Sequence, residues 1–358
     1  MYKMREWEKN IRRVEPYVPG EQPEIVDVVK LNTNENPYPP SPEVIEAAES
    51  FDFDRLRLYP DPQASVLVQA IADEYGFDKD CVFVGVGSDD VLAMCFMTFF
   101  NSDKPVLFPN ITYSFYSVWA QLFNIAYEEV GLDSEFNIIP ESFNKPNGGI
   151  IFPNPNAPTS IYLEPDKVEQ IIKNNQSSVV IVDEAYIDFG GKSALELTKK
   201  YENLLVVQTF SKSRSMAGMR IGYAIGNKNL IKALNDVKFS FNSYTMNATS
   251  LVYGTCSIKD RAYFNECVQK IINTREHSKK RLTQLGFTYP DSKANFIFAS
   301  HKSIRADIIF DELKKRNIYV RYFNKPLIDN YIRITIGTDE QMDKLFAALE
   351  EIIDERSI

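Results

Sequence analysis

Short runs of continuously apolar residues alternate with helical patterns between about residues 80 and 226. Runs that are apolar at every position indicate strands buried on both faces, which is typical of a mostly parallel sheet covered by helices. The sequence therefore predicts an α/β fold. The expected strands are CVFVGVG (81–87), KPVLFP (104–109), GGIIFPNPN (148–156), SVVIVDEAY (178–186), NLLVVQTF (203–210) and RIGYAIG (220–226). The expected helices cover 88–100, 112–123, 165–174 and 194–201.

The pattern changes after about residue 228, where long helical stretches precede a few short strands. This predicts a smaller α+β domain. Its expected helices are 228–238, 246–285 (closed by Gly286), 304–316 and 339–354, and its expected strands lie in 294–300, 317–323 and 331–338. The first thirty residues show no comparable alternation and are expected to pack on either domain. We predict a large domain over 30–245 and a small one from 1–29 and 246–358.

The overall charge narrows the range of partners. The chain has 358 residues and a formal net charge of −9. A general nucleic-acid partner or an anionic membrane surface is therefore not expected, because both need broad positive fields. The apolar runs are too short to span a bilayer, and the charged start MYKMREWEKNIRR does not have the apolar core of a signal peptide. We predict a cytoplasmic protein.

Cysteine and histidine usage excludes several chemistries. The four cysteines, Cys81, Cys95, Cys256 and Cys267, form no CxxC pair, and all but Cys256 are expected to be buried free thiols. Of the two histidines, His277 lies in the charged stretch TREHSKKR and His301 in an expected turn, so both are expected to be solvated. A Ser-His-Asp triad, a Cys-His pair and a metal site are not expected.

Several polar residues follow the expected strands, and ligands of doubly wound sheets bind at the carboxyl ends of the strands. The turn Gly85–Asp90 opens a helix, so it is either an anion site or an ordinary, well-capped turn. Asp183 and Glu184 end another strand. Their carboxylates are interpreted as part of a ligand site, as a helix cap or as part of a structural ion pair. Lys212 follows a third strand and, considered alone, is most simply a surface charge.

Taken together, these residues match one cofactor. A lysine in a restricted site forms a Schiff base with an aldehyde. An aspartate opposite it can hold a ring N–H⁺, and a helix N-terminus with Ser211 and Arg220 can hold a phosphate. Aldehyde, pyridinium nitrogen and phosphate occur together in pyridoxal phosphate.

At this point the chain resembles a known family, the histidinol-phosphate aminotransferases among the fold-type I pyridoxal-phosphate aminotransferases. The resemblance extends over nearly the whole length and implies their fold, a large domain with a mostly parallel sheet plus a smaller α+β domain. It rests on LNTNENPYPP (31–40), LYPDPQ (58–63), GVGSDD (85–90), TYSFY (112–116), NPNAPTS (154–160), DEAYIDF (183–189), TFSKSRSMAGMRIGYAIG (209–226) and YIRITIG (331–337).

The resemblance implies roles around the cofactor. Lys212 would carry it covalently and move protons. Asp183 would pair with the pyridine nitrogen, Tyr186 would hydrogen-bond the phenolic oxygen, and Tyr113 would stack on the ring. The phosphate would be held by Ser88, Asp89, Ser211 and Arg220.

The resemblance also implies substrate and subunit contacts. Tyr59 would reach the cofactor phosphate of a neighbouring subunit, so a homodimer with a shared active site is expected. Arg333 would bind the anionic group of the substrate, assisted by Arg321 and Tyr17. The residue pattern alone leaves these arginines open as ordinary solvated strand residues, or as a cationic wall on neighbouring strands.

Two residues depart from the family pattern Asn-Pro-Thr-Gly. Ala157 replaces the asparagine that normally contacts the phenolic oxygen, so either Asn156 substitutes for it or Tyr186 acts alone. Ser160 replaces the glycine, which leaves the geometry of the local turn open. Arg214, inside the lysine motif, has no assigned role beyond a surface or dimer contact.

The implied reaction is amino transfer from L-histidinol phosphate to 2-oxoglutarate, giving imidazole acetol phosphate and L-glutamate in histidine biosynthesis. An aromatic amino acid aminotransferase and a threonine-phosphate decarboxylase share the fold and remain alternatives. A non-catalytic pyridoxal-phosphate-binding sensor is a further alternative from another functional class, although no DNA-binding module fits in the chain.

Overall fold

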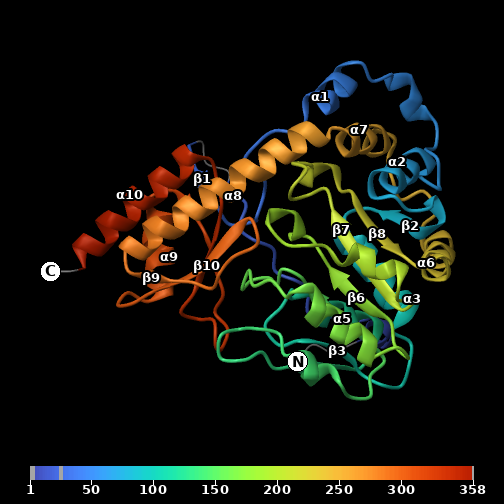
Figure 1. Cartoon of the computed structure of the whole chain (residues 1–358), viewed down its shortest axis with the longest axis horizontal. Helices are drawn as coiled ribbons and strands as arrows, with labels where there is room; N and C mark the ends of the chain where they lie inside the picture. Colours follow the sequence, from blue (N-terminus) through green and yellow to red (C-terminus); the bar gives the residue numbers. More distant parts are fainter. Residues whose placement is uncertain (1–4, 24–26, 357–358) are drawn as a thin grey trace.

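The computed structural model describes residues 5–23 and 27–356. A seven-stranded sheet forms the centre of the larger part of the molecule (Figure 1). Its strands, in spatial order, are β2 (Val82–Gly85), β8 (Gly222–Gly226), β7 (Leu204–Thr209), β6 (Val180–Asp183), β5 (Gly149–Pro153), β3 (Val106–Pro109) and β4 (Tyr127–Val130). The five strands from β7 to β4 are mutually parallel, whereas β8 runs antiparallel to both of its neighbours. The predicted mostly parallel sheet is confirmed, and the edge strand β4 is an addition to the prediction.

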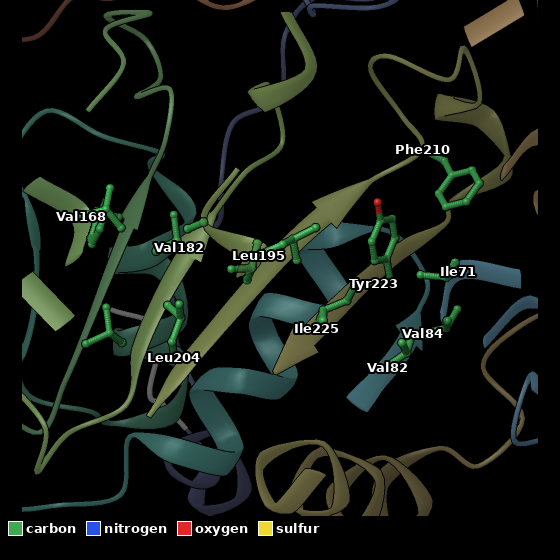
Figure 2. Close-up of a cluster of buried hydrophobic side chains, with 14 of the residues drawn as sticks. Ile71, Val82, Val84, Val168, Val182, Leu195, Leu204, Phe210, Tyr223 and Ile225 are labelled. Carbon is green, nitrogen blue, oxygen red and sulfur yellow. The ribbon is translucent and has the colours of Figure 1, made fainter. Parts of the chain in front are cut away.

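Helices cover both faces of this sheet because its central strands are apolar on both sides. Along β7, Leu204 and Val206 belong to one buried cluster, and Leu205 and Val207 belong to another on the opposite face. Figure 2 shows part of the first cluster. Each such side chain contributes about 1.5–3 kcal/mol when it is fully buried. The helices of this region are α1 (Pro42–Glu49), α2 (Ser65–Tyr75), α3 (Ser88–Phe99), α4 (Phe115–Phe123), α5 (Pro165–Asn174), α6 (Lys228–Phe241) and α7 (Ala248–Lys259).

A second, antiparallel sheet belongs to the C-terminal part. Its order is β12 (Arg321–Tyr322), β13 (Ile332–Thr335), β10 (Phe296–His301) and β9 (Phe287–Thr288). Helices α8 (Arg261–Gln284), α9 (Ala306–Lys315) and α10 (Asp339–Glu355) accompany it. A separate parallel pair joins β1 (Val29–Lys30) to β11 (Ile318–Tyr319). The N-terminal segment therefore pairs with the C-terminal part.

The predicted helix over 246–285 is two helices in the structure. Helix α7 ends at Lys259 and α8 begins at Arg261, and the carboxylate of Asp260 between them accepts a hydrogen bond from the N–H of Tyr263 at 3.1 Å. Figure 1 shows α8 as the long helix that runs from α7 toward the second sheet. Helix α7 packs on α1 and α2, and the division of domains at residues 245 and 246 stays a prediction.

Three expectations about single residues were wrong. His301 is buried at the end of β10, where Nε2 donates to the carbonyl of Leu285 at 2.9 Å and burial lowers its pKa. Cys81 is only half-buried, as is Cys256, although all four cysteines are free. Arg214 is buried rather than on the surface, because Nη1 donates to the carbonyl of Ser257 at 2.7 Å and the guanidinium lies over the ring of Phe264.

Among the described residues, no helix is both long enough and apolar enough to cross a membrane.

Candidate active site

The side chain of Lys212 lies just beyond the carboxyl end of β7. Its Nζ donates to the carbonyl of Thr33 at 3.2 Å and lies 5.7 Å from the centre of the Tyr186 ring. Tyr186 follows β6, so two neighbouring parallel strands bring these residues together as predicted. The Tyr186 hydroxyl accepts a hydrogen bond from the Asn34 amide at 3.0 Å.

Asp183 is the last residue of β6, and its carboxylate is buried. Burial raises the pKa of Asp183 to about 6. The Tyr116 hydroxyl, which donates to Oδ2 at 2.9 Å, and the Ala185 N–H, which donates to Oδ1 at 3.1 Å, oppose this rise, as does the charge of Lys212. Asp183 is therefore a buried carboxylate that hydrogen bonds keep ready to ionise near neutral pH.

The neighbouring Glu184 serves a different purpose. Its carboxylate accepts hydrogen bonds from the Ser193 hydroxyl, the Ala194 N–H and the Gln208 amide. Burial raises its pKa to about 7 despite these donors. Glu184 thus has a structural role, because it holds Ser193, the N-cap residue of the 3-10 helix Ala194–Lys199, and the first N–H of that helix.

An anion cradle surrounds the start of α3. The N–H groups of Ser88 and Asp89 open this helix and have no intrahelical partner, and within residues 5–23 and 27–356 no side chain caps them. The guanidinium of Arg220 bonds to the Ser211 hydroxyl at 3.4 Å and to the Asp89 carboxylate at 3.3 Å. All four predicted phosphate ligands are therefore gathered at one place.

Two glycines keep this cradle open. A Cβ on Gly87, whose φ is +86°, would lie 2.6 Å from Nη2 of Arg220. A Cβ on Gly222 would lie 2.3 Å from the backbone nitrogen of Ser88. A cradle of backbone N–H groups, a hydroxyl and a guanidinium fits a phosphate group.

Tyr113 and Asn156 are placed less directly. The Tyr113 hydroxyl donates to Asp89 at 2.8 Å, and its stacking on a cofactor stays a prediction. The Asn156 amide nitrogen donates to the carbonyl of Ile111 and the hydroxyl of Thr159, both at 2.9 Å. Its Oδ1 is buried without a partner among the described residues. Asn156 therefore offers an acceptor here, and its role toward a phenolic oxygen stays untested.

Ser160 adopts a left-handed backbone conformation in its turn. Ser160 has φ of +66°, in the left-handed region that favours glycine. Its hydroxyl donates to the carbonyl of Thr159 at 2.5 Å, and its side chain is fully buried. The serine therefore adopts the backbone conformation that a glycine would adopt most readily.

Arg321 and Arg333 lie directly opposite each other on β12 and β13. Arg333 donates to the carbonyl of Asn32 at 2.9 Å, and its Nε is buried without a partner among the described residues. Burial lowers the pKa of Arg333. Among the described residues, Arg321 donates hydrogen bonds to two backbone carbonyls, those of Val18 and Pro19, each at 3.3 Å. In the described part of the chain, neither guanidinium forms an ion pair with a carboxylate.

Two predicted tyrosines differ in their placement. The ring of Tyr17 stacks on Phe115 at 4.2 Å between centroids, and the next residue contacts Arg321, so Tyr17 lies between α4 and the arginine pair. Tyr59 is 82% exposed, and its ring contacts Tyr244. The structure therefore does not bring Tyr59 to the site of its own chain.

Sequence reasoning missed several residues that shape the site. Tyr116 was quoted only within a motif, although it holds Asp183. Thr33, Asn34 and Asn36 contact the lysine or Tyr186. The signal was available in LNTNENP, where asparagines occur at every second position and precede a proline.

The family model for aminotransferases of class I and II matches residues 26–349. The chain belongs to the aminotransferase class I and II family. Its curated relatives within this family include the histidinol-phosphate aminotransferase of Brachyspira hyodysenteriae, 53% identical over 96% of this chain and 97% of the relative. That of Clostridium beijerinckii is 50% identical over 97% of both chains. The resemblance to histidinol-phosphate aminotransferases is confirmed.

Solved structures of aminotransferases share the fold. The histidinol-phosphate aminotransferase of Sinorhizobium meliloti, solved in complex with pyridoxal 5'-phosphate, aligns with a TM-score of 0.84 at 22% identity over 91% of each chain. The L-threonine-O-3-phosphate decarboxylase of Porphyromonas gingivalis aligns with a TM-score of 0.76 at 19% identity, over 91% of this chain and all of that one. At these identities the likeness establishes the fold alone.

Proposed function

We propose that this aminotransferase transfers the amino group of L-histidinol phosphate to 2-oxoglutarate, with pyridoxal phosphate as its cofactor, in histidine biosynthesis. The products are imidazole acetol phosphate and L-glutamate. Full-length relatives that are 53% and 50% identical support this substrate. The structural observation that carries it is the arginine pair Arg321 and Arg333, which no described carboxylate neutralises.

The residues of the site fit pyridoxal phosphate. The cradle of Ser88, Asp89, Ser211 and Arg220 would hold its phosphate, and Asp183 would face the ring nitrogen. When bound, this cofactor supplies an aldehyde that links to amines and a ring that accepts the electrons of a broken Cα–H bond.

The chain's own contribution is to hold and move protons. Lys212 would provide the amine that holds the aldehyde, and its Nζ would serve as general base and then general acid for the proton that leaves the Cα of the substrate. Asp183 keeps a proton on the ring nitrogen. The hydrogen bonds from Tyr116 and Ala185 favour the charged carboxylate that this task requires.

The arginine pair accounts for an anionic substrate. Two guanidiniums on paired strands repel each other, and desolvation of Arg333 adds a further cost. A phosphate dianion offsets both effects, because it balances two positive charges and matches the planar fork of arginine. A neutral aromatic side chain would leave this charge unbalanced, which disfavours the aromatic amino acid alternative.

A parallel turnover assay with 2-oxoglutarate tests the substrate. Histidinol phosphate, phenylalanine and phosphothreonine are compared as donors, and release of CO₂ is measured with phosphothreonine. We expect histidinol phosphate to be strongly preferred. A preference for phenylalanine would refute the proposed substrate, and CO₂ release would favour the decarboxylase.

Replacing either arginine by glutamine should selectively lower activity with the phosphorylated substrate. We expect R333Q and R321Q to lower kcat/KM for histidinol phosphate about 10- to 100-fold, as loss of a charge-assisted hydrogen bond implies. Activity with unphosphorylated histidinol should change far less. R305Q is the matched control, because Arg305 is exposed and pairs with Asp307 instead. Equal losses on both substrates would contradict phosphate binding by this pair.

We also propose a homodimer whose subunits complete each other's sites. Large apolar side chains are exposed around Tyr59 and the end of α6, and such patches mark protein interfaces. The exposed side chains are Phe53, Leu56, Leu58, Tyr59, Phe241 and Tyr244, and the rings of Tyr59 and Tyr244 link the two segments. Tyr59 would then contact the partner's cofactor phosphate. The free state of all four cysteines supports a reducing, cytoplasmic location.

Mixing two inactive variants tests the shared site. Y59A and K212A are unfolded together and refolded, so that mixed dimers carry one site with both native residues. We expect the mixture to exceed the summed activity of the separately refolded variants. Purely additive activity, or a monomer in sedimentation analysis, would contradict the shared site.

A further inference from the structure

The side chain of Asn36 forms hydrogen bonds with the main chain at Lys212. Its Nδ2 donates to the carbonyl of Lys212 at 3.0 Å and to that of Ser213 at 3.1 Å. Its Oδ1 accepts from the N–H of Tyr38 at 3.0 Å. This last bond fixes the orientation of the amide, so that Nδ2 faces the two carbonyl groups.

Neighbouring residues anchor the lysine loop through their side chains: the Ser213 hydroxyl donates to Asp188 at 2.6 Å, and Arg214 donates to the carbonyl of Ser257 at 2.7 Å. The bonds from Asn36 act on the main chain of the lysine itself. Lys212 lies beyond the end of β7, in a loop whose backbone is not part of the sheet. Within that loop, the carbonyl of Lys212 accepts only a long bond, 3.4 Å, from the N–H of Ser215. The two shorter bonds come from Asn36, 176 residues earlier in the chain.

The same short segment also contacts the amine of the lysine and its surroundings. The carbonyl of Thr33 accepts from Nζ of Lys212 at 3.2 Å. The Asn34 amide donates to the hydroxyl of Tyr186 at 3.0 Å, and the carbonyl of Asn32 accepts from Arg333 at 2.9 Å. Residues 32–36 therefore contact the lysine, the tyrosine and one anion-binding arginine.

We propose that Asn36 is a positioning residue, which fixes the main chain of Lys212 so that its amine stands in register with Tyr186 and the arginine pair. This proposal rests on the proposed function of Lys212 as the cofactor-binding lysine. Asn36 acts through the lysine and takes no proton itself. A displacement of about 1 Å at a reacting group costs about 100-fold in rate. Loss of the Asn36 hydrogen bonds is therefore expected to lower the reaction rate measurably.

The test uses N36A and N36D, with N203A as a matched control. The Asn203 amide also donates to two backbone carbonyls, those of Asn175 at 3.1 Å and Ser178 at 2.9 Å, beside the large sheet. Cofactor-free protein is mixed with pyridoxal phosphate, and the rate at which the absorbance band of lysine-bound cofactor forms is followed by stopped flow. Tm, kcat and KM are measured on the same samples.

We expect N36A to slow formation of the band and to lower kcat, each by about 10- to 100-fold. KM for histidinol phosphate should stay near the wild-type value, because the arginine pair is unchanged. N203A should lower Tm comparably but leave both rates intact. If N36A does not fold, N36D provides the test, because its carboxylate can still accept from Tyr38 but presents an acceptor to two carbonyls.

The outcomes separate the two proposals. Wild-type rates in a folded Asn36 variant, with only the loss of Tm that N203A also shows, would overturn the positioning role. Absence of the band in both the wild type and N203A would instead overturn the proposed function of Lys212.

Discussion

Replacing Lys212 by alanine is expected to lower amino transfer by about a thousandfold or more. The variant loses both the amine that binds the cofactor aldehyde and the base that moves the substrate proton, and positioned acid–base groups alone contribute about 10²- to 10⁴-fold. The absorbance band of lysine-bound cofactor should disappear as well. Turnover with histidinol phosphate and 2-oxoglutarate, together with the absorbance spectrum, measures both losses.

The matched control is K173A, which removes an exposed lysine on α5. It should keep both the band and the turnover. Among the described residues, the Lys212 side chain forms one hydrogen bond, to the carbonyl of Thr33, and K212A keeps the main-chain bonds, so this variant is expected to fold. Near-normal turnover in K212A would show that another group does the chemistry.

The Asp183→Asn variant should lose about 100-fold or more in kcat. The amide is nearly the same size but carries no charge, so it no longer keeps a proton on the ring nitrogen. The Tyr116 hydroxyl and the Ala185 N–H donate to the two different carboxylate oxygens of Asp183. An asparagine has one acceptor oxygen in place of two, so it cannot keep both hydrogen bonds in the same geometry. The comparison is made at saturating substrate and cofactor.

The same substitution should change how stability depends on pH. The folded pKa of Asp183 is about 6, above its usual value of 3.8. The folded protein therefore holds this proton more tightly than the unfolded chain, so the stability due to this group is present below about pH 4 and is lost as pH rises through 6. Between pH 5 and pH 7, the contribution of Asp183 to the free energy of unfolding of the wild type falls by about 1 kcal/mol. D183N should not show this fall.

Urea unfolding of the cofactor-free proteins at these two pH values checks this prediction. The difference between wild type and D183N isolates Asp183, because all other titrating groups occur in both. A difference that stays constant with pH would mean that Asp183 is not a buried, titrating carboxylate. A difference that changes with pH as expected would mean that the buried charge of Asp183 is a cost that the protein accepts in return for catalysis.

Much of the fold followed from local pattern. Pro165 and the apolar spacing behind it predicted α5 over 165–174, which matches the structure residue for residue. The apolar run around Val206 predicted β7 because every position is buried on one face or the other. The edge strand β4 was missed because its sequence, YEEV, carries two exposed glutamates and no apolar periodicity.

Some residues of the candidate site could likewise be predicted from the sequence, and others could not. Asp183 ends β6, Lys212 follows β7, and Arg220 precedes the antiparallel strand β8, so the sheet topology brings all three to one edge. Thr33 and Asn36 could not be placed in this way, since their contacts to Lys212 cross more than 170 residues of sequence. His301 was misjudged because the expected strand stopped one residue short of it.

The pairing of β1 with β11 affects the order in which parts of the nascent chain can fold. Val29 lies opposite Ile318, so β1 has no pairing strand until synthesis has reached residue 318. At about 5–20 residues per second this delay is on the order of tens of seconds. The large sheet is complete once β8 is synthesised, whereas the segment that contacts the lysine is anchored last. A nascent chain would thus assemble its large sheet before the β1–β11 pair anchors the segment that contacts the lysine.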